Sequence, residues 1–279
     1  MTLLCVGFGI AYGFWASGFV DIKLSILALA GSVLLHAAVN IWNDYFDYRF
    51  GVDRPGVGTV LYRVHPIISG VLEPRVVLLL GFVFSGLAMC IATVLLFASR
   101  WFAIILGFVG FMLAYGYTGT PFKLKYRGLG EVSVFTAWGP LMVVGGSYVG
   151  SGFASLDTIL VSIPLGLLVS AVLLANNIRD IESDKNAGVF TLAVRVGVDW
   201  STRLYKAMVL VSYLVVAILV AGGLLPFSSL LCFASLPLAI GLVRSFSRGV
   251  SVDADPRTAR VVVVFGLLYI VSIFISIFM

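Results

Sequence analysis

The sequence predicts an all-α membrane protein, with nine transmembrane helices arranged around a central cavity. Hydrophobic residues make up 61% of the 279 residues, charged residues make up only 11%, and the mean hydropathy is +1.10. Soluble domains carry roughly 45–50% apolar and about 25% charged residues. Apolar runs also recur along the chain, each at about the 20-residue length that a helix needs to cross a bilayer. We therefore expect one transmembrane domain over residues 1–279 rather than a soluble protein.

Nine apolar runs are the predicted spans, taken in chain order. They cover residues 2–20, 24–46, 76–98, 101–119, 131–151, 156–178, 204–223, 227–245 and 260–278. Pro164 and Pro237 fall inside two of these runs. Because proline has no backbone N–H, we expect each to kink its helix.

Four polar segments separate the spans and carry most of the charge. Of the 18 Lys and Arg residues, all but Lys23 and Arg100 lie in segments 47–75, 120–130, 179–206 and 244–260. Basic loops favour the cytoplasmic side, so these four loops predict a cell-membrane protein whose charged end faces the cytoplasm. An odd number of spans then places the N-terminus inside and the C-terminus outside. The net charge of +5 is thus a topology signal, and we expect no nucleic-acid partner.

A carboxylate-rich stretch, Asn-Ile-Trp-Asn-Asp-Tyr-Phe-Asp, ends the second apolar run at residues 40–47. On a helix, Asn40, Asp44 and Asp47 are spaced i, i+4 and i+7 and therefore line one face. A carboxylate near hydrocarbon is costly unless it is paired or holds a metal. This spacing indicates a functional site rather than acidic residues that only face water.

A second stretch, Asn-Asn-Ile-Arg-Asp-Ile-Glu-Ser-Asp at residues 176–184, echoes the first at the end of the sixth run. Asn176, Asp180 and Asp184 are spaced i, i+4 and i+8, so a continuous helix would again place them on one face. Acids that only face water would not explain the repeated Asn-x-x-x-Asp pattern. We expect both stretches to meet at the cytoplasmic mouth of the bundle.

Facing carboxylates repel one another unless cations lie between them. All-oxygen ligands suit Mg²⁺, which is often held by one or two carboxylates together with substrate phosphates. We therefore predict that four aspartates are both metal ligands and catalytic residues: Asp44, Asp47, Asp180 and Asp184. Cations in the neighbouring loops would bind the phosphates and stabilise a departing diphosphate. These are Arg63, Lys123, Lys125, Arg179 and Lys185.

These motifs resemble those of the UbiA superfamily of intramembrane prenyltransferases. The first matches as Asn40-x-x-x-Asp44-x-x-Asp47, and the second as Asp180-x-x-x-Asp184. Between them, the stretch Tyr-Thr-Gly-Thr-Pro-Phe-Lys-Leu-Lys from Tyr117 to Lys125 is similar to the family's Tyr-then-Lys loop, and His65-Pro-Ile-Ile-Ser-Gly70 also fits. The resemblance extends over most of the chain, including the nine-span layout.

The resemblance implies an enzyme that transfers an isoprenyl chain from a polyprenyl diphosphate and releases diphosphate. It implies Mg²⁺, or alternatively Mn²⁺, on the four aspartates, and substrate binding by Asn40, Tyr117 and Asn176 beside the loop cations. The Asn-Asp-Tyr-Phe-Asp-Tyr stretch and the Leu-Gly-Glu segment at 129–131 look most like the menaquinone branch. That branch prenylates 1,4-dihydroxy-2-naphthoate. Other acceptors stay open, among them 4-hydroxybenzoate and a glycerol-phosphate lipid.

The chain departs from the family pattern after the first motif. Many relatives carry another acid four residues after the position of Asp47, but here that position is Gly51 and the next acid is Asp53. Such enzymes form an allylic cation, which a dry, aromatic-lined bundle would shield from water. Four aromatic residues are candidates for this lining: Trp42, Phe46, Phe111 and Tyr115.

Three other classes compete with this interpretation. Buried acids also fit an ion-coupled transporter, although transport sites lie near the membrane midplane and these acids lie at helix ends. A membrane alcohol phosphotransferase also uses aspartates and Mg²⁺, but no Asp-Gly-x-x-Ala-Arg run occurs here. A purely structural membrane protein would not need paired acids.

Overall fold

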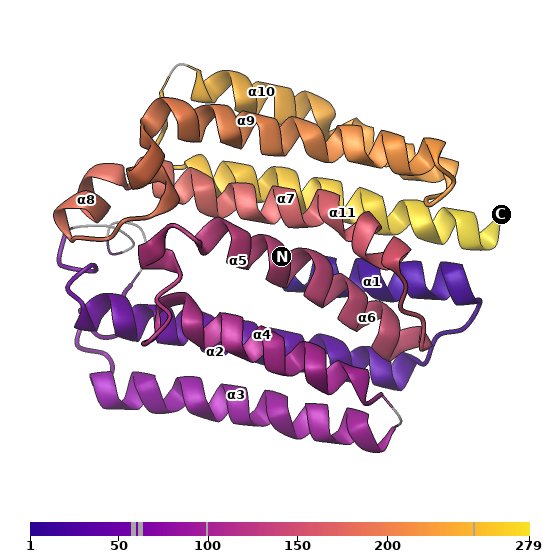
Figure 1. Cartoon of the computed structure of the whole chain (residues 1–279), viewed down its shortest axis with the longest axis horizontal. Helices are drawn as coiled ribbons and strands as arrows, with labels where there is room; N and C mark the ends of the chain where they lie inside the picture. Colours follow the sequence, from indigo (N-terminus) through magenta and orange to yellow (C-terminus); the bar gives the residue numbers. More distant parts are fainter. Residues whose placement is uncertain (57–59, 61–63, 99, 248) are drawn as a thin grey trace.

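The computed structural model describes residues 1–56, 60, 64–98, 100–247 and 249–279, and this part of the chain consists of helices and turns without strands. The long helices lie side by side with roughly parallel axes (Figure 1). The α-helices are α1 (Thr2–Ser17), α2 (Ile22–Arg49), α3 (Pro74–Phe97), α4 (Phe102–Thr118), α5 (Gly130–Thr136), α6 (Met142–Ser151), α7 (Leu156–Arg179), α8 (Ile181–Asn186), α9 (Leu192–Ala221), α10 (Leu236–Phe246) and α11 (Ala254–Phe278). Three further segments are the 3₁₀ turn η2 (Lys125–Arg127), the π-helical η3 (Ala137–Leu141) and the 3₁₀ helix η4 (Phe227–Ser235).

The predicted all-helical class is confirmed, but the count of nine spans is not. Seven helical segments among the described residues are long and apolar enough to cross a membrane, with α5, η3 and α6 acting as one and η4 with α10 as another. The helices α1 and α4 are shorter, at 16 and 17 residues. They lie within the predicted runs 2–20 and 101–119 but do not reach the length of a full span.

The two prolines that we expect to kink helices lie in different settings. Pro237 lies at the first turn of α10, where η4 ends, so the run 227–245 is two helices in series. Pro164 lies inside α7, which is assigned as one helix from Leu156 to Arg179. A third proline, Pro140, lies in η3, where a π-helical turn joins α5 to α6. Such turns accommodate a residue that cannot donate a helical hydrogen bond.

Helices α2 and α7 begin at side chains that satisfy free backbone N–H groups. The Asp21 side chain accepts from the backbone N–H of Leu24 at 3.0 Å at the start of α2. Ser155 and Thr158 form a capping box at the start of α7. Each of these polar side chains satisfies a donor that the helix itself leaves open.

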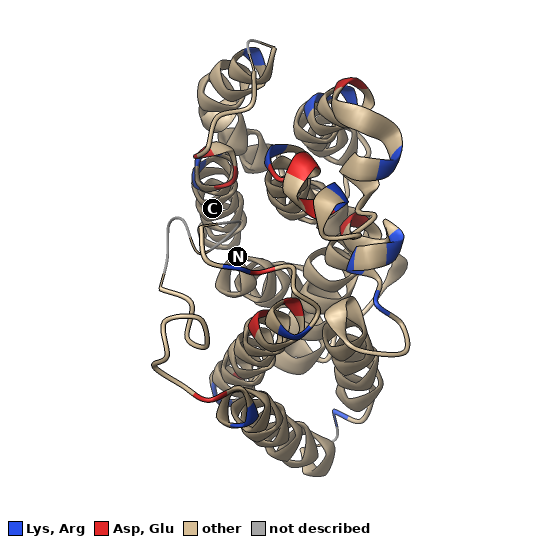
Figure 2. Cartoon of the chain, turned by 90° about the vertical axis from the view of Figure 1, so that its left-hand side faces the viewer, with Lys and Arg blue, Asp and Glu red and all other residues tan. Residues whose placement is uncertain are grey.

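The bundle brings both acidic stretches to one end of the molecule. Helix α2 packs against α3 and α4, while α7 packs against α9, α11 and α5. Because α2 and α7 both carry their acidic stretch at the C-terminal end, the two stretches lie at the same end of the bundle. Figure 2 looks onto this end and shows Lys, Arg, Asp and Glu gathered there.

Candidate active site

A polar pocket lies at the charged end, where the C-terminal ends of α2 and α7 meet the start of α8 and the turn η2. We call it the acidic pocket. Its walls come from Val39, Asn40, Asn43, Asp47, Val52, Asp53, Tyr117, Lys125, Leu173, Asn176, Asn177, Asp180, Ser183 and Asp184. Most of the residues predicted from the two motifs and from the Tyr–Lys loop therefore lie around one space.

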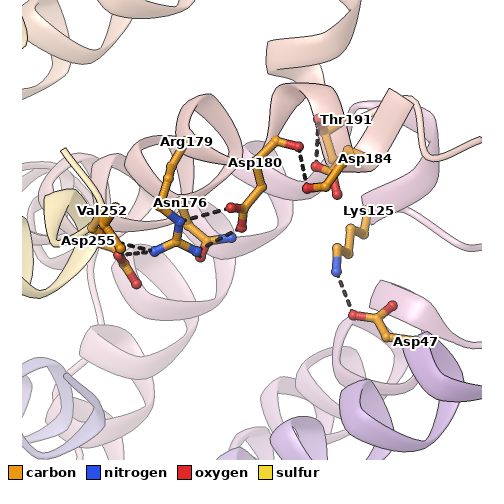
Figure 3. Close-up of polar contacts among 10 residues, drawn as sticks. Asp47, Lys125, Asn176, Arg179, Asp180, Asp184, Thr191, Val252 and Asp255 are labelled. Atoms are coloured by element: carbon orange, nitrogen blue, oxygen red, sulfur yellow. Dashed lines mark hydrogen bonds and ion pairs between the residues drawn. The ribbon is translucent and has the colours of Figure 1, made fainter. Parts of the chain in front are cut away.

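Asp47 is buried in the pocket wall and is held by two groups from η2. Lys125 Nζ lies 2.6 Å from Asp47 Oδ2, and the Tyr126 hydroxyl donates to Oδ1 at 2.5 Å (Figure 3 shows the lysine contact). Burial alone would lower the pKa of Lys125, but the Asp47 carboxylate outweighs it and the pKa lies well above its usual value. Burial, followed by the nearby Asp47 charge, raises the pKa of Tyr126. Lys125 thus stays charged beside the carboxylate.

Asp180 is held by its neighbour Arg179. Arg179 Nε and Nη2 donate to the two Asp180 carboxylate oxygens at 2.8 and 2.7 Å. Nη2 also donates to Asn176 Oδ1 at 2.6 Å, and Nη1 donates to Asp255 Oδ1 at 2.5 Å and to the Val252 carbonyl at 3.3 Å (Figure 3). A guanidinium has five N–H groups, and this set of contacts engages all of them. Arg179 therefore orders the second acidic stretch and ties α7 to α11.

The second stretch does not form one continuous helical face. Helix α7 ends at Arg179, and Asp180 (φ −97°, ψ 10°) joins it to the short helix α8. Asn176, Asp180 and Asp184 nevertheless all line the acidic pocket. The three side chains therefore line one pocket even though the helix is interrupted at Asp180.

Asp184 is a buried carboxylate, 6% exposed, in a site with other acids nearby. The Thr191 hydroxyl donates to Asp184 Oδ2 at 3.4 Å. Burial is the largest influence on its pKa, Asp180 and Asp47 raise it further, Lys125 opposes them, and the resulting pKa is about 7. At neutral pH this carboxyl binds a proton far more readily than an ordinary aspartate does.

Asp44 is also buried but is absent from the pocket wall. Its carboxylate lies in a separate cluster with Asp53 and His65, whose potential ligand atoms lie within 4.8 Å of one another. Asp53 lines the acidic pocket, and His65 Nε2 lies 3.4 Å from its Oδ2. Burial, and then the Asp47 charge, raises the pKa of Asp53, with Lys125 and His65 opposing the rise. Asp53 thus connects the Asp44 cluster to the pocket.

The remaining predicted cations do not line the pocket. Lys123 Nζ lies 3.6 Å from the centroid of the Phe50 ring. Lys185 is exposed on α8. Arg63 lies outside the described residues.

An apolar cavity of about 300 Å³ adjoins the acidic pocket and extends between α2, α3, α4 and α6. Val39, Asn40 and Tyr117 line both spaces, so the two adjoin through these residues. Of the four aromatic candidates, Phe111 lines the apolar cavity, whereas Trp42, Phe46 and Tyr115 pack together between α2 and α4. The cavity has the character of a site for a hydrocarbon chain.

The donor atoms of the acidic pocket fit a hard divalent cation. Its polar wall offers carboxylates from four aspartates and amide oxygens from four asparagines, with no Cys or His in the lining. Two of these amide oxygens, Asn43 Oδ1 and Asn177 Oδ1, are buried without a hydrogen-bond partner among the described residues. Mg²⁺ prefers such oxygen ligands, and unsatisfied buried acceptors favour a cation.

Four polar lining residues were missed by the sequence motifs. Asn43 and Asn177 lie beside motif residues, Ser183 precedes Asp184, and Asp53 is the acid that follows the Gly51 departure. Asn177 Nδ2 donates to Glu131 Oε1 at 2.9 Å, which fixes the amide between α7 and α5. Only Asp53 carried a signal in the sequence, as the next acid after Gly51.

The chain is similar to known proteins over nearly its whole length. The model of the UbiA prenyltransferase family matches residues 2–277. The 1,4-dihydroxy-2-naphthoate octaprenyltransferase of Bacillus subtilis is 30% identical over 267 residues, which cover 93% of this chain and 84% of that protein. A UbiA homolog from Aeropyrum pernix K1 shares the fold with a TM-score of 0.76, at 19% identity and 97% coverage of both chains. A UbiA homolog from Archaeoglobus fulgidus, solved with GPP and Mg²⁺, has a TM-score of 0.69 at 16% identity, covering 99% of this chain and 96% of that one.

Proposed function

The chain belongs to the UbiA prenyltransferase family, and from this premise we propose that it transfers a polyprenyl chain to an aromatic quinone precursor with the help of Mg²⁺. As a member of the family it is a multi-pass membrane protein and a prenyltransferase. The observation that carries the proposal is the meeting of two unlike spaces at Val39, Asn40 and Tyr117. One is acidic and suits a metal–diphosphate head, and the other is apolar and suits an isoprenoid tail.

In this proposal the acidic pocket binds the diphosphate head of the donor. Asp47, Asp53, Asp180 and Asp184, with Asp44 close to Asp53, would hold Mg²⁺, in line with the GPP- and Mg²⁺-bound relative. When bound, Mg²⁺ would supply positive charge to the oxygens of the leaving diphosphate. Mn²⁺ offers the same oxygen chemistry and could replace it.

The residues of the pocket would act on the bond that breaks. Lys125 is the cation in the pocket wall, so it would exchange its contact with Asp47 for the charge that develops on the diphosphate. Asn40 and Tyr117 lie where the two spaces meet, so they would orient the first isoprene unit. The allylic C–O bond would break and diphosphate would leave. The freed carbon would then bond to an electron-rich carbon of the acceptor ring, and that ring carbon would lose its proton, which restores the aromatic ring. The apolar cavity would keep water from quenching the cation.

Arg63, Lys123, Lys185 and Arg179 keep supporting roles in this proposal. Lys123 and Lys185 do not line the pocket and Arg63 lies outside the described residues, and in this proposal these three cations attract the diphosphate as it enters. Arg179 would hold Asp180 and Asn176 in place. We propose that this end faces the cytoplasm of the cell membrane, because the basic loops lie there.

The acceptor proposed first is 1,4-dihydroxy-2-naphthoate. Its support is the Bacillus subtilis relative together with the Asn-Asp-Tyr-Phe-Asp-Tyr stretch. The enzyme purified in detergent would be supplied with geranylgeranyl diphosphate, Mg²⁺ and, in separate reactions, 1,4-dihydroxy-2-naphthoate, 4-hydroxybenzoate and a glycerol-phosphate lipid. Mass spectrometry would identify prenylated products, and diphosphate release would be measured in parallel.

We expect a prenylated naphthoquinone precursor, its loss in Asp184→Asn, and near-normal yield in Glu182→Gln, an exposed acid on the same helix. Product with the glycerol-phosphate lipid alone would reassign the acceptor. Absence of diphosphate release with every acceptor would reject the proposed reaction.

A further inference from the structure

The loop after α2 folds back onto the last turn of that helix. Gly51 adopts a positive φ of 72°, a conformation that glycine reaches without strain. The backbone N–H groups of Val52 and Asp53 then both donate to the Asp47 carbonyl, at 2.8 and 3.2 Å. This turn places the Asp53 side chain in the acidic pocket, although residue 51 itself offers no carboxylate.

His65 reaches the same carboxylate from the other side of the loop. Its side chain is buried, with 1% of the residue exposed. His65 Nδ1 accepts from the backbone N–H groups of Ile67 and Ile68, each at 3.3 Å. A neutral imidazole carries one N–H, so the proton lies on Nε2. Nε2 lies 3.4 Å from Asp53 Oδ2, and His65, Asp53 and Asp44 form the 4.8 Å cluster.

We propose that His65 is a positioning residue whose Nε2–H holds the Asp53 carboxylate in the acidic pocket, where Asp53 contributes to divalent-cation binding. The proposal rests on the metal-dependent function given above and adds His65 to it. His65 acts through Asp53 and does not touch the cation.

The hydrogen bonds of His65 exclude a role as metal ligand in this arrangement. Ligation through Nε2 needs the lone pair on that nitrogen, which would move the proton to Nδ1. A protonated Nδ1 would face the two backbone N–H donors of Ile67 and Ile68, and all three donors would lose their partner in a buried site. Burying unsatisfied donors costs about 1–3 kcal/mol each. With the proton on Nε2, Nδ1 keeps its two backbone donors, and the buried Nε2–H, which makes no hydrogen bond among the described residues, lies 3.4 Å from Asp53 Oδ2.

Cation binding by the metal-free protein tests the proposal without relying on turnover. Mn²⁺ alone would be titrated into detergent-purified, EDTA-stripped protein, and free Mn²⁺ would be read by electron paramagnetic resonance. His65→Asn is too short to place an amide N–H at the Nε2 position, whereas His65→Gln can. Asp53→Asn removes the carboxylate charge with little change of shape.

We expect His65→Asn and Asp53→Asn each to weaken Mn²⁺ binding about 10-fold, the lower end of the range for the outer partners of metal ligands. The double variant should be no weaker than Asp53→Asn, because the two residues act as one unit. His65→Gln should recover most of the affinity. Unchanged binding in Asp53→Asn would overturn the proposal, and so would additive losses in the double variant, which would mean that His65 acts independently of Asp53.

Two controls keep this inference separate from the proposed function. Asp184→Asn should lose Mn²⁺ binding if the acidic pocket holds the cation at all, and failure of the wild type to bind Mn²⁺ would reject the metal site itself. Normal binding by the wild type, with no effect of either Asp53→Asn or His65→Asn, would reject only the His65–Asp53 inference. Asp53→Asn provides this test even if His65→Asn fails to fold.

Discussion

At the scale of single residues, protonation of Asp184 makes the stability of the folded protein depend on pH. Its pKa is about 7 in the folded protein, against an ordinary value of 3.8. The folded state therefore binds this proton more tightly than the unfolded chain does. The resulting stability is present below about pH 4 and is lost as pH rises through about 7. In EDTA, the melting temperature should fall between about pH 5 and pH 7.5.

Replacing Asp184 by Asn removes the titrating group and should flatten that pH dependence. Glu182→Gln on the same helix is the matched control, because Glu182 is exposed. Differential scanning fluorimetry at several pH values would measure all three proteins. The assignment of this pH dependence to Asp184 fails if the slopes of wild type and Asp184→Asn coincide.

Lys125 and Lys123 are two residues apart, yet the structure gives them different surroundings. Lys125 lines the acidic pocket beside Asp47, whereas Lys123 covers the Phe50 ring. Lys125→Ala should lower kcat/KM for the diphosphate donor on the order of 100-fold, as expected when one charge-stabilising donor is removed. Lys123→Ala should have a much smaller effect. Steady-state kinetics with a varied donor concentration would compare them, and equal losses would contradict the difference in role.

The residues of the pocket show where sequence reasoning reached its limit. Spacing was enough to bring Asp47, Asp180 and Asp184 together, because carboxylates at helix ends carry a strong signal. Asp53 could be seen as an extra acid, but its position depends on the turn at Gly51, which motif spacing does not describe. The contact between Arg179 and Asp255 joins α7 to α11 across 76 positions, and no local pattern predicts it.

At the scale of elements, the contact between α1 and α6 depends on glycine. A Cβ atom built on Gly9 would lie 2.1 Å from the Val143 carbonyl oxygen, and one on Gly146 would lie 2.4 Å from the Val6 carbonyl oxygen. Small residues allow membrane helices this close approach. Gly9→Ala should therefore destabilise the protein by about 1–3 kcal/mol, the usual cost of overpacking.

Gly7→Ala is the matched control on the same helix. A Cβ atom there would meet only Ile270 Cδ1, at 3.6 Å, which is an ordinary contact. Thermal unfolding in one detergent should show a lower melting temperature for Gly9→Ala and little change for Gly7→Ala. Equal melting temperatures would mean that the contact between α1 and α6 accommodates a methyl group at Gly9 without loss of stability.

Helix existence was predicted well and helix ends were not. Every predicted apolar run contains helix, because hydrophobic runs of this length have few alternatives in a bilayer. Helix α9, however, begins at Leu192 rather than near 204 and changes direction at Gly197 (φ 80°, ψ 169°). Its first turns carry Arg195 and Asp199, so hydropathy alone assigned them to a loop. The break at Asp180 was missed for a similar reason, since a polar segment does not reveal where its helix stops.

At the scale of the whole molecule, the number of helices that cross the membrane determines whether all the charged loops lie on the same side of it. Helix α4 has 17 residues, so it is about 26 Å long, slightly less than the roughly 30 Å of a hydrocarbon core. Its two ends are nevertheless anchored at opposite ends of the bundle. Arg100 Nε, before α4, donates to the Val149 carbonyl near the end of α6. Tyr117, in its last turn, lines the acidic pocket.

We therefore predict that α4 crosses the membrane and that the bilayer thins slightly around it. Single cysteines at Trp101 and Phe122, which are 58% and 48% exposed, would bracket the helix in a protein whose Cys5, Cys90 and Cys232 are replaced by Ala. A membrane-impermeant maleimide applied to intact cells should label Trp101→Cys, whereas Phe122→Cys should react only after permeabilisation. Glu182→Cys, at the charged end on α8, should behave like Phe122→Cys because both lie on the proposed cytoplasmic side. Labelling of Trp101→Cys and Phe122→Cys from the same side would mean that α4 does not cross, and the predicted nine-span topology would be wrong.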